Sequence, residues 1–339
     1  GGVVTHDLWI INAAAVFVPK TKSGLFARTL KSSSAVRRVD RDYMQDWLSL
    51  DKTPAPASPE ASGWPFPGGS QKTPWGVQRV QAQKAWSVTR GAGVKLAVID
   101  TGVDFDHPEL KVAGGFNAID NAVSFKDDHG HGTHVSGTIA ALDNAKGVVG
   151  VAPDVALYGV KVLNASGSGT YAQVIAGMQW CVENGIDVAN MSLGGSKGEP
   201  AMAEAVTAVT AAGVTIVAAA GNSGGSVGYP AAYPEVIAIS ASTSGDGLAN
   251  FSSRGPQVDF IAPGLNIPSL FKGGGYKTLS GTSMACPHMA GLAALAVAAK
   301  GVRGQEAVRA ALTGAATMLP KLSPAAQGAG MVDAAKLVQ

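Results

Sequence analysis

From about residue 94 onward, short apolar runs alternate with stretches of helical spacing. The runs that predict strands are VKLAVID (94–100), ALYGVKVL (156–163), DVANMS (187–192), VTIVAAAG (214–221) and VIAISAS (236–242). Apolar residues recur with helical spacing over 132–142, 171–185 and 283–300. Strands that are apolar throughout are buried on both faces, and their alternation with helices is typical of a parallel sheet. We therefore expect an α/β fold in which a mainly parallel sheet is covered by helices on both faces.

The first fifty residues have a pattern of their own. VVTHDLWII and AAAVFVP predict two strands that meet at Asn12, KSGLFARTLKSS has helical spacing, and AVRRVDRDY predicts a further strand. About fifty residues are few for an independent core, so we expect this segment to lean on its neighbour. The stretch 51–74 is rich in Pro, Gly and Ser and predicts a linker. The sequence thus predicts a small α+β domain at 1–48, a linker at 49–69 and a larger domain at 70–339.

Composition and charge narrow the function classes. The net charge is only +2, with seven basic and four acidic side chains in residues 1–48 and a near balance elsewhere, so no basic stripe favours nucleic acid. No apolar run predicts a membrane span, and no export signal stands at residue 1. The two cysteines, Cys181 and Cys286, form no disulfide framework, and we expect two free buried thiols.

Three histidines fall within six positions in DDHGHGTHVSGT, residues 127–138. His129, His131 and His134 could supply imidazole nitrogens to zinc, with Asp127 or Asp128 completing the ligand set. Alternatively, one of them could move a proton for a nucleophile elsewhere in the chain. The stretch alone allows both interpretations.

Two further stretches favour proton transfer. VIDTGVDFDHPEL places Asp100 at the end of a predicted strand, and SGTSMACPHMAG places Ser283 at the start of a long predicted helix. Nucleophilic hydrolysis needs a hydroxyl, a base and a group that orients the base, and Ser283, His131 and Asp100 are of these types. The backbone N–H groups at a helix start can also face a developing oxyanion.

The order Asp, His, Ser within DTG, HGTHVSGT and GTSMACPH resembles the subtilisin family of serine endopeptidases, over roughly residues 70–339. The resemblance implies that His131 deprotonates Ser283, that Asp100 orients His131, and that Asn222 in AAAGNSGG donates to the oxyanion. It implies a secreted, monomeric hydrolase that cuts protein or peptide substrates through an acyl-enzyme. The rival interpretations are a non-catalytic binding module with the same fold and a metallohydrolase.

The resemblance also implies where a substrate lies. Extended peptide would pair with two strand edges, SLGG (192–195) and GSGTY (167–171). The pocket for the side chain before the cut would be walled by small neutral residues and would accept large apolar side chains, whereas a second apolar pocket would lie three residues upstream. The residues implied for the first pocket are Ser192, Leu193, Gly194, Ala219, Gly221 and Gly228, and those for the second are Tyr171, Val174 and Leu193.

Calcium is the ion that the resemblance implies. ALDNAKGVVG (141–150) resembles the strong calcium loop of the family, and oxygen-only ligands suit Ca2+. The implied ligands are Gln71, Glu109, Leu142, Asn144, Lys146 and Val148. Glu109 stands where the family usually has Asp. A weaker cation site is implied near Ala231, Tyr233, Val236 and Asp259.

Residues 1–48 resemble, more loosely, the later part of a subtilisin propeptide, a ferredoxin-like inhibitor and folding chaperone whose usual first strand and helix would precede Gly1. The resemblance implies that the end of this segment lies in the cleft like a product. We expect self-cleavage between Leu48 and Ser49, with a site in the linker as the alternative, and an inhibited pro-form.

Overall fold

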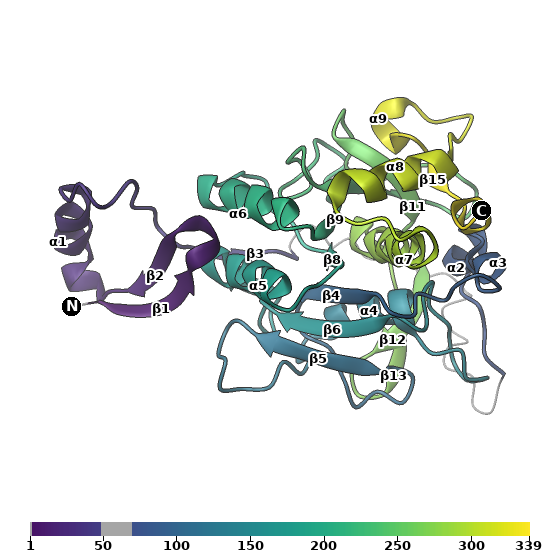
Figure 1. The fold of residues 1–339 in the computed structure, drawn as a ribbon, viewed down its shortest axis with the longest axis horizontal. Coiled ribbons are helices and arrows are strands. Elements are labelled where there is room, and N and C mark those ends of the chain that lie inside the picture. The colour runs from purple at the N-terminus through teal and green to yellow at the C-terminus, as the bar shows by residue number, and fades with distance from the viewer. Residues whose placement is uncertain (1, 49–69) are drawn as a thin grey trace.

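A seven-stranded sheet forms the centre of the computed structural model, which describes residues 2–48 and 70–339 (Figure 1). The strand order is β11-β10-β9-β8-β4-β6-β5, and every neighbouring pair is parallel. The strands are β4 (Lys95–Asp100), β5 (Val112–Asn117), β6 (Ala156–Lys161), β8 (Val188–Met191), β9 (Thr215–Ala219), β10 (Ile237–Ser242) and β11 (Val258–Pro263). The five predicted strands are confirmed. The prediction missed the two edge strands, because β5 contains two glycines and β11 contains a charged Asp259.

Helices cover both faces of this sheet, as alternation along β4 shows. Leu96 and Val98 pack into one hydrophobic cluster with residues of α4 and α7, whereas Ala97 and Ile99 pack into a second cluster with residues of α5 and α6. The expected fold class is therefore confirmed. The main helices are α4 (His131–Ala140), α5 (Tyr171–Glu183), α6 (Pro200–Ala211), α7 (Thr282–Lys300) and α8 (Gln305–Ala315). Short elements complete the larger domain: α2 (Trp75–Arg79), α3 (Ala82–Ala85), β7 (Ser168–Thr170), β12 (Ile267–Phe271), β13 (Gly275–Leu279), β14 (Ala316–Thr317), α9 (Pro324–Gln327), β15 (Met331–Val332) and α10 (Ala334–Leu337).

Helix α7 is buried over most of its length. By length and composition it could cross a bilayer, with a mean hydropathy of 1.3, so the prediction that no apolar run reaches membrane length was wrong for this segment. Because 89% of that window is buried inside the protein, α7 is a core helix here. It packs against α4, α8 and strands β8 to β11 of the sheet, and its first turn carries Ser283.

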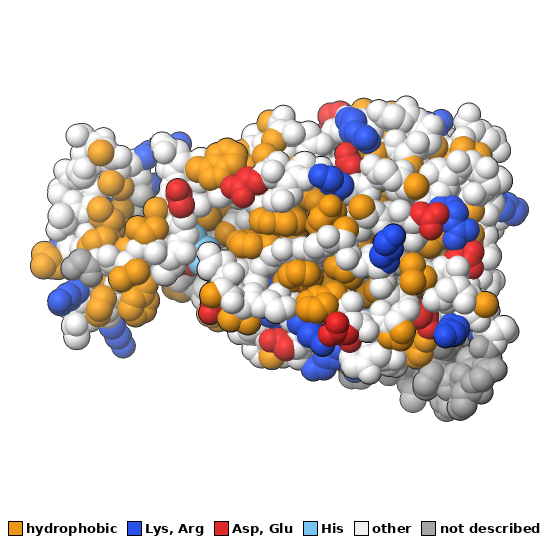
Figure 2. Space-filling model, turned by 60° about the horizontal axis from the view of Figure 1, so that its bottom comes forward, with side chains coloured by type: hydrophobic (Ala, Val, Ile, Leu, Met, Phe, Trp, Pro, Cys, Tyr) orange, Lys and Arg blue, Asp and Glu red, His pale blue; other side chains and the backbone are white. Residues whose placement is uncertain are grey.

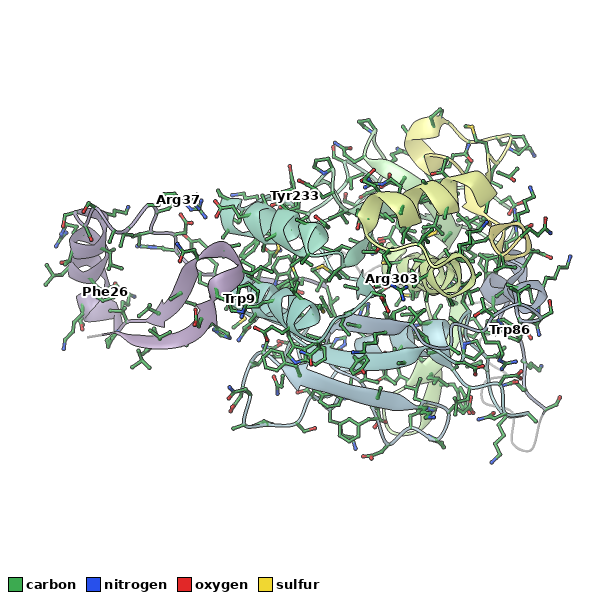
Figure 3. All side chains as sticks on the ribbon, in the orientation of Figure 1. Trp9, Phe26, Arg37, Trp86, Tyr233 and Arg303 are labelled. Atoms are coloured by element: carbon green, nitrogen blue, oxygen red, sulfur yellow. The ribbon has the colours of Figure 1, made fainter. Side chains whose placement is uncertain are left out.

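The N-terminal segment forms a separate lobe that touches the larger domain through one end (Figures 1 and 2). Strands β1 (Val3–Leu8) and β2 (Ala13–Phe17) pair antiparallel, joined by η1 (Trp9–Ile11) and by Asn12 in the left-handed conformation. This hairpin lies against α5 and α6, and α1 (Lys20–Lys31) has no buried residue. Trp9 and Arg37 lie where the N-terminal lobe meets the larger domain, whereas Phe26 lies at the end of the lobe that points away from that domain (Figure 3). Two strands and one helix fall short of a complete ferredoxin-like domain, so that part of the expected fold stays a prediction.

The strand predicted over 35–43 is wrong. These residues form no strand, and Arg37 and Arg38 bind the Glu204 carboxylate on α6 at 2.6 and 2.8 Å. A shorter strand, β3 (Met44–Asp46), follows and pairs antiparallel with β7 of the larger domain. The N-terminal segment therefore ends on the strand edge at which the sequence places a bound peptide.

Candidate active site

Asp100 and His131 meet at the carboxyl end of the sheet. Asp100 is the last residue of β4 and fully buried, and His131 is the first residue of α4. The His131 Nδ1 lies 2.8 Å from Oδ1 and 2.9 Å from Oδ2 of Asp100. A carboxylate at Nδ1 keeps the proton on that nitrogen, so Nε2 carries the lone pair and can act as a base. This pair joins two of the three positions that the sequence places in one site.

The start of α4 is held by a second carboxylate, Asp127. Its Oδ2 accepts from the Thr133 N–H at 2.9 Å, which satisfies a donor that the first helical turn would otherwise leave free. Its Oδ1 accepts from the Gly130 N–H at 2.8 Å and from the Thr101 hydroxyl at 2.9 Å. The residue before α4, Gly130, has φ +106°, a conformation that glycine adopts without strain. The turn that presents His131 is therefore built from a capping carboxylate and a glycine.

Ser283 reaches the same end of the sheet from α7. It is the second residue of that helix and is 1% exposed, and its hydroxyl donates to the Ser192 carbonyl at 3.0 Å. Ser192 lies two residues beyond Asn190, which pairs with Val98 of β4, so Ser192 and Asp100 leave adjacent strands at the same level. Helices α4 and α7 also pack together. The hydroxyl of Ser283 thus lies beside the strand ends that carry the Asp100–His131 pair.

The Asn222 amide has a defined orientation. Its Oδ1 accepts from the Thr282 N–H at 2.7 Å and from the Thr282 hydroxyl at 2.9 Å. Because the oxygen is committed to Thr282, the orientation makes Nδ2 the end of the amide that serves as a donor. Asn222 follows β9, and Thr282 immediately precedes Ser283. An anion-stabilising donor next to the first turn of α7 is the arrangement that an oxyanion needs.

The other two histidines of the cluster have different surroundings. His134 is fully buried, and its Nε2 lies 3.0 Å from the carbonyls of both Ile267 and Lys277, so the ring joins α4 to the β12–β13 hairpin. Burial lowers the pKa of His134 to about 3, which keeps the ring neutral. Burial also lowers the pKa of His129, whose ring centre lies 6.3 Å from that of His131.

The zinc interpretation is therefore wrong. The rings of His131 and His134 have separate partners, and in the described part of the chain no three His, Cys, Asp or Glu side chains form a group that could hold a metal.

The substrate edge that the sequence predicts carries the end of the N-terminal segment. Gln45 of β3 pairs with Gly169 of β7, and the N–H of Trp47 donates to the Gly167 carbonyl at 3.1 Å. On the opposite side, the N–H of Gly194 donates to the Trp47 carbonyl at 3.1 Å. The two predicted edges, 167–171 and 192–195, thus hold one extended strand between them.

Several of the predicted pocket residues line a small cavity. About 10 Å3 of space is lined by Trp47, Leu193, Gly194, Ala219, Gly221, Thr282 and Ser283, which brings four predicted pocket residues next to Ser283. Trp47 is 1% exposed, packs edge-on against Tyr171 with ring centres 4.9 Å apart, and donates its indole N–H to the Gly169 carbonyl at 2.9 Å. Val174 is buried within α5, and the N–H of Gly228 donates to the Ala220 carbonyl at 2.9 Å. The sequence did not single out Trp47.

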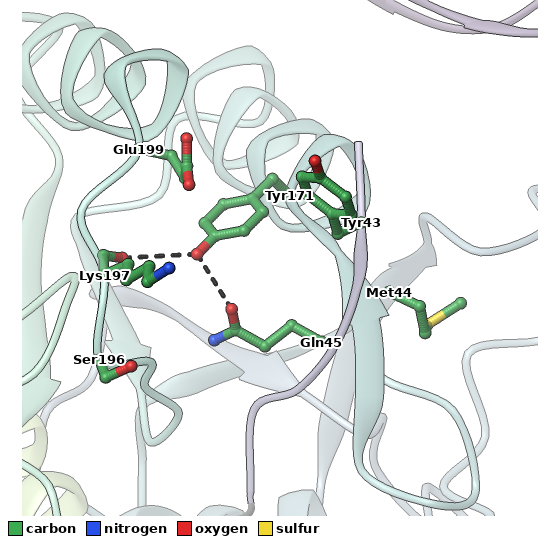
Figure 4. Close-up of a pocket in the computed structure, with 7 residues that line it drawn as sticks. All are labelled: Tyr43, Met44, Gln45, Tyr171, Ser196, Lys197 and Glu199. Carbon is green, nitrogen blue, oxygen red and sulfur yellow. Dashed lines mark hydrogen bonds between the residues drawn. The ribbon is translucent and has the colours of Figure 1, made fainter. Parts of the chain in front are cut away.

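Beside this strand lies a larger pocket of about 420 Å3 (Figure 4). The Tyr171 hydroxyl forms one wall and donates to Gln45 Oε1 at 3.0 Å. The described residues that line it are Tyr43, Met44, Gln45, Tyr171, Ser196, Lys197 and Glu199. The pocket is therefore shared between the N-terminal segment and the larger domain.

The residues of the predicted calcium loop converge in part. The Gln71 Nε2 donates to the carbonyls of Leu142 and Val148 at 2.6 and 3.0 Å, so these two carbonyls face one point. Turning the amide by 180° would place its oxygen beside them, and three such oxygens suit Ca2+. The Glu109 carboxylate accepts from the Val148 N–H at 3.1 Å and contacts the Tyr276 hydroxyl.

The remaining two residues of the implied calcium set lie in the same turn. The Asn144 Oδ1 accepts from the Lys146 N–H at 3.0 Å. The oxygen that the sequence assigned to the ion is thus directed into its own loop in this structure.

At the weaker cation site that the sequence implies, a guanidinium group binds two of the four residues. Arg309 Nη2 donates to the carbonyls of Pro234 and Val236 at 2.8 and 3.1 Å, and its Nε lies 3.3 Å from Asp259 Oδ1. Two of the four residues implied for this site, Val236 and Asp259, therefore bind Arg309. The sequence did not single out this arginine, which lies about seventy residues from Val236 along the chain.

The two cysteines are free and buried, as expected. The Cys286 thiol donates to the Val217 carbonyl at 3.3 Å, and burial raises its pKa, so it stays a neutral packing group three residues from Ser283.

Comparison with known proteins places this chain in a family. Residues 91–330 match the Subtilase family. Subtilisin DY from Bacillus licheniformis is 46% identical over 256 residues, which cover 74% of this chain and 93% of that protein. Subtilisin Savinase from Lederbergia lenta is 48% identical over 228 residues, covering 67% of this chain and 84% of that protein. Subtilisin E from Bacillus subtilis (strain 168) is 44% identical over 326 residues, covering 94% of this chain and 79% of that protein, so this match extends into the N-terminal segment.

Proposed function

Because this chain belongs to the subtilase family and is a serine endopeptidase, we propose that Ser283 is the nucleophile, His131 the general base and Asp100 the group that orients it. The observation that carries this proposal is the contact of His131 Nδ1 with both oxygens of the buried Asp100. His131 Nε2 would take the Ser283 proton as the hydroxyl oxygen attacks the peptide carbonyl. The protonated ring would then donate to the leaving amine, and water would hydrolyse the acyl-enzyme by the same route.

We assign the oxyanion to two donors, the Nδ2 of Asn222 and the backbone N–H of Ser283. Asn222 is held by Thr282, which supports a fixed direction for Nδ2. The Ser283 N–H belongs to the first turn of α7, whose partial positive charge also favours an anion. Donors that are fixed before the reaction stabilise the developing charge without a reorganisation cost.

The substrate is proposed to bind as an extended strand between β7 and residues 192–195. The support is the N-terminal segment itself, which lies there with backbone bonds to Gly167 and Gly194. Among the residues that the structure describes, the cavity beside Ser283 is lined by neutral groups of the larger domain, with no charged side chain. We therefore expect broad specificity, with large apolar side chains preferred before the cut.

Residues 1–48 are proposed to be a propeptide that inhibits residues 70–339, with 49–69 as the linker. A strand that fills the substrate edges would exclude substrate, and the backbone bonds of β3 and Trp47 along these edges support this role. Leu48 is 5% exposed and belongs to the same hydrophobic cluster as Trp47. Cleavage between Leu48 and Ser49 stays a prediction, because Ser49 lies outside the described residues.

Calcium is proposed to bind the 141–150 loop. The bonds of Gln71 to the Leu142 and Val148 carbonyls and of Glu109 to the Val148 N–H support a shell built from these four residues, which Asn144 and Lys146 would join after the loop adjusts. The ion would stabilise the fold and take no part in the reaction. We also propose that the mature enzyme acts outside the cell as a monomer.

The catalytic assignment is tested by labelling with a fluorophosphonate after the propeptide has been removed. Peptide mapping should place the label on Ser283, and Ser283→Ala should abolish both labelling and casein hydrolysis. A matched control, Ser240→Ala, replaces a buried serine of β10 whose hydroxyl donates to the Ala326 carbonyl of α9 at 2.6 Å, and it should keep both. An active Ser283→Ala protein, or a label elsewhere, would overturn the assignment.

A further inference from the structure

The Asp127 carboxylate accepts more hydrogen bonds than capping a helix requires. Asp127 is 5% exposed. Its Oδ1 accepts from the N–H groups of His129 and Gly130 at 2.9 and 2.8 Å, and from the Thr101 hydroxyl at 2.9 Å. Its Oδ2 accepts from the N–H and the hydroxyl of Thr133 at 2.9 and 2.6 Å. Capping the first turn of α4 uses only part of this set, and the bond to Thr101 leads to another element.

Thr101 connects this carboxylate to the Asp100–His131 pair. Its backbone N–H donates to Asp100 Oδ1 at 2.7 Å, which is the oxygen that also faces His131 Nδ1. Its hydroxyl donates to Asp127 and accepts from the Gly132 N–H at 2.9 Å. The contacts close a ring that runs from Asp127 through Thr101 to Asp100, across to His131, and back through the first turn of α4.

We propose that Asp127 is a positioning residue for proton transfer, acting through Thr101 to hold the Asp100 carboxylate and the His131 ring in register. This proposal rests on the proposed function of His131 and Asp100. Asp127 does not touch the substrate edges, which belong to β7 and to residues 192–195. Its loss would therefore disturb the relative placement of base and nucleophile and leave the peptide-binding edges in place.

The kinetic consequence is a fall in kcat with little change in KM. A shift of about 1 Å in the reacting groups can cost about 100-fold in rate. Substrate binding depends on the backbone bonds of the edges and on the apolar pocket, which the ring does not include. A purely structural cap would instead lower thermal stability and leave kcat of the folded fraction unchanged.

The experiment compares Asp127→Asn with Asp333→Asn in the full chain, after a trace of mature wild-type enzyme has removed the propeptide. Asp333 caps the remote helix α10, accepting from the N–H groups of Ala335 and Lys336, so its loss is a matched control. We expect kcat on a peptide substrate to fall about 10- to 100-fold in Asp127→Asn at a KM within about twofold of wild type. The control should lose stability and keep kcat, measured per active site by fluorophosphonate titration.

A second pair of variants tests the route through Thr101. Thr101→Val removes the linking hydroxyl, and Thr101→Ser keeps it, so the serine variant should restore most of the activity that the valine variant loses. Both substitutions interrupt the same ring of hydrogen bonds, so their effects should not multiply. The kcat of the double variant Asp127→Asn/Thr101→Val should lie within about threefold of the kcat of the slower single variant. If Asp127→Asn does not fold, the Thr101 pair decides the outcome.

Equal kcat in Asp127→Asn and wild type, or equal losses in Thr101→Val and Thr101→Ser, would overturn the positioning role. Multiplying losses in the double variant would contradict a shared route. These results differ from failure of the proposed function, because in that case the wild-type enzyme itself would not be labelled at Ser283.

Discussion

The backbone N–H of Gly194 donates to the carbonyl of Trp47 at 3.1 Å, so a residue of the N-terminal segment is bonded to the strand edge of the larger domain. The Trp47 side chain continues this contact, since it is fully buried between Tyr171 and the cavity beside Ser283. The Arg37 and Arg38 bonds to Glu204, by contrast, lie on partly exposed side chains. Exposed ion pairs contribute little, so we expect Trp47 to dominate the hold on the segment.

Trp47→Ala should therefore weaken inhibition by residues 1–48. Truncating a buried aromatic anchor at an interface costs about 2 kcal/mol or more, which corresponds to about 30-fold faster release. The measurement is the delay between cleavage of the full chain, followed on gels, and the appearance of peptidase activity. Trp9→Ala is the matched control, because Trp9 is 51% exposed and contacts Glu183 far from Ser283. A delay shortened equally by both variants would show that the hairpin, not the cleft strand, sets the rate.

Asn222→Ala should lower kcat and leave KM nearly unchanged. The amide stabilises charge that exists only in the transition state, and removal of one such donor typically costs about 100- to 1,000-fold in kcat. Steady-state kinetics on a peptide substrate measure both constants. Asn184→Ala serves as the control, because Asn184 donates to Trp180 at the far end of α5 and should keep its full kcat. A rise in KM with an unchanged kcat would place Asn222 in substrate binding instead.

Much of the fold follows from local patterns. The apolar runs that become β4, β6, β8, β9 and β10 are buried on both faces, so they lack the polar alternation of a half-exposed strand. The same reasoning failed for β5, which is an edge strand and contains Gly114 and Gly115. Edge strands are half-exposed, and glycine adds no side chain to the pattern, so such strands carry little signal.

The candidate site was predictable only where its residues stand in a motif. Asp100, His131 and Ser283 lie in Gly-rich turns at element ends, whereas Trp47 and Arg309 act through tertiary contacts with residues about seventy or more positions away. No local pattern marks such contacts, because they depend on which surfaces the fold brings together. For the same reason the sequence assigned Val236 and Asp259 to a cation without including the arginine that binds them.

Calcium removal should destabilise the mature enzyme through the 141–150 loop. An ion that binds only the folded state adds about 2.7 kcal/mol when its concentration is 100 times the dissociation constant. Gln71→Ala should remove most of this gain, because the amide faces the carbonyls of Leu142 and Val148. Thermal unfolding of the fluorophosphonate-blocked enzyme, with calcium or with a chelator, measures the effect. The exposed Gln78, which donates to Thr73, provides the control variant Gln78→Ala, and an equal calcium response in both variants would contradict the site.

The buried His134 predicts how stability depends on pH. Burial lowers its pKa to about 3 in the folded protein, whereas an unfolded chain binds this proton near pH 6.5. Between these values the unfolded state holds more protons than the folded state, so stability falls as pH falls through this window. His288, with a pKa lowered by burial to about 4, acts in the same direction. At about pH 4.5 His134 alone should cost on the order of 3 kcal/mol relative to pH 8.

His134→Gln separates this titration from the packing role of the ring. The amide can still donate to the carbonyls that Nε2 of His134 faces, those of Ile267 and Lys277, but it does not titrate. Both proteins are compared after fluorophosphonate has blocked their activity. At pH 8, where both side chains are neutral, we expect His134→Gln to be somewhat less stable than wild type. On acidification we expect it to lose less stability than wild type. Urea unfolding at several pH values between about 4.5 and 8 gives the two slopes. If the free energy of unfolding depended on pH equally in both proteins, His134 would take up its proton in the folded protein. Its burial between α4 and the β12–β13 hairpin would then not keep the ring neutral.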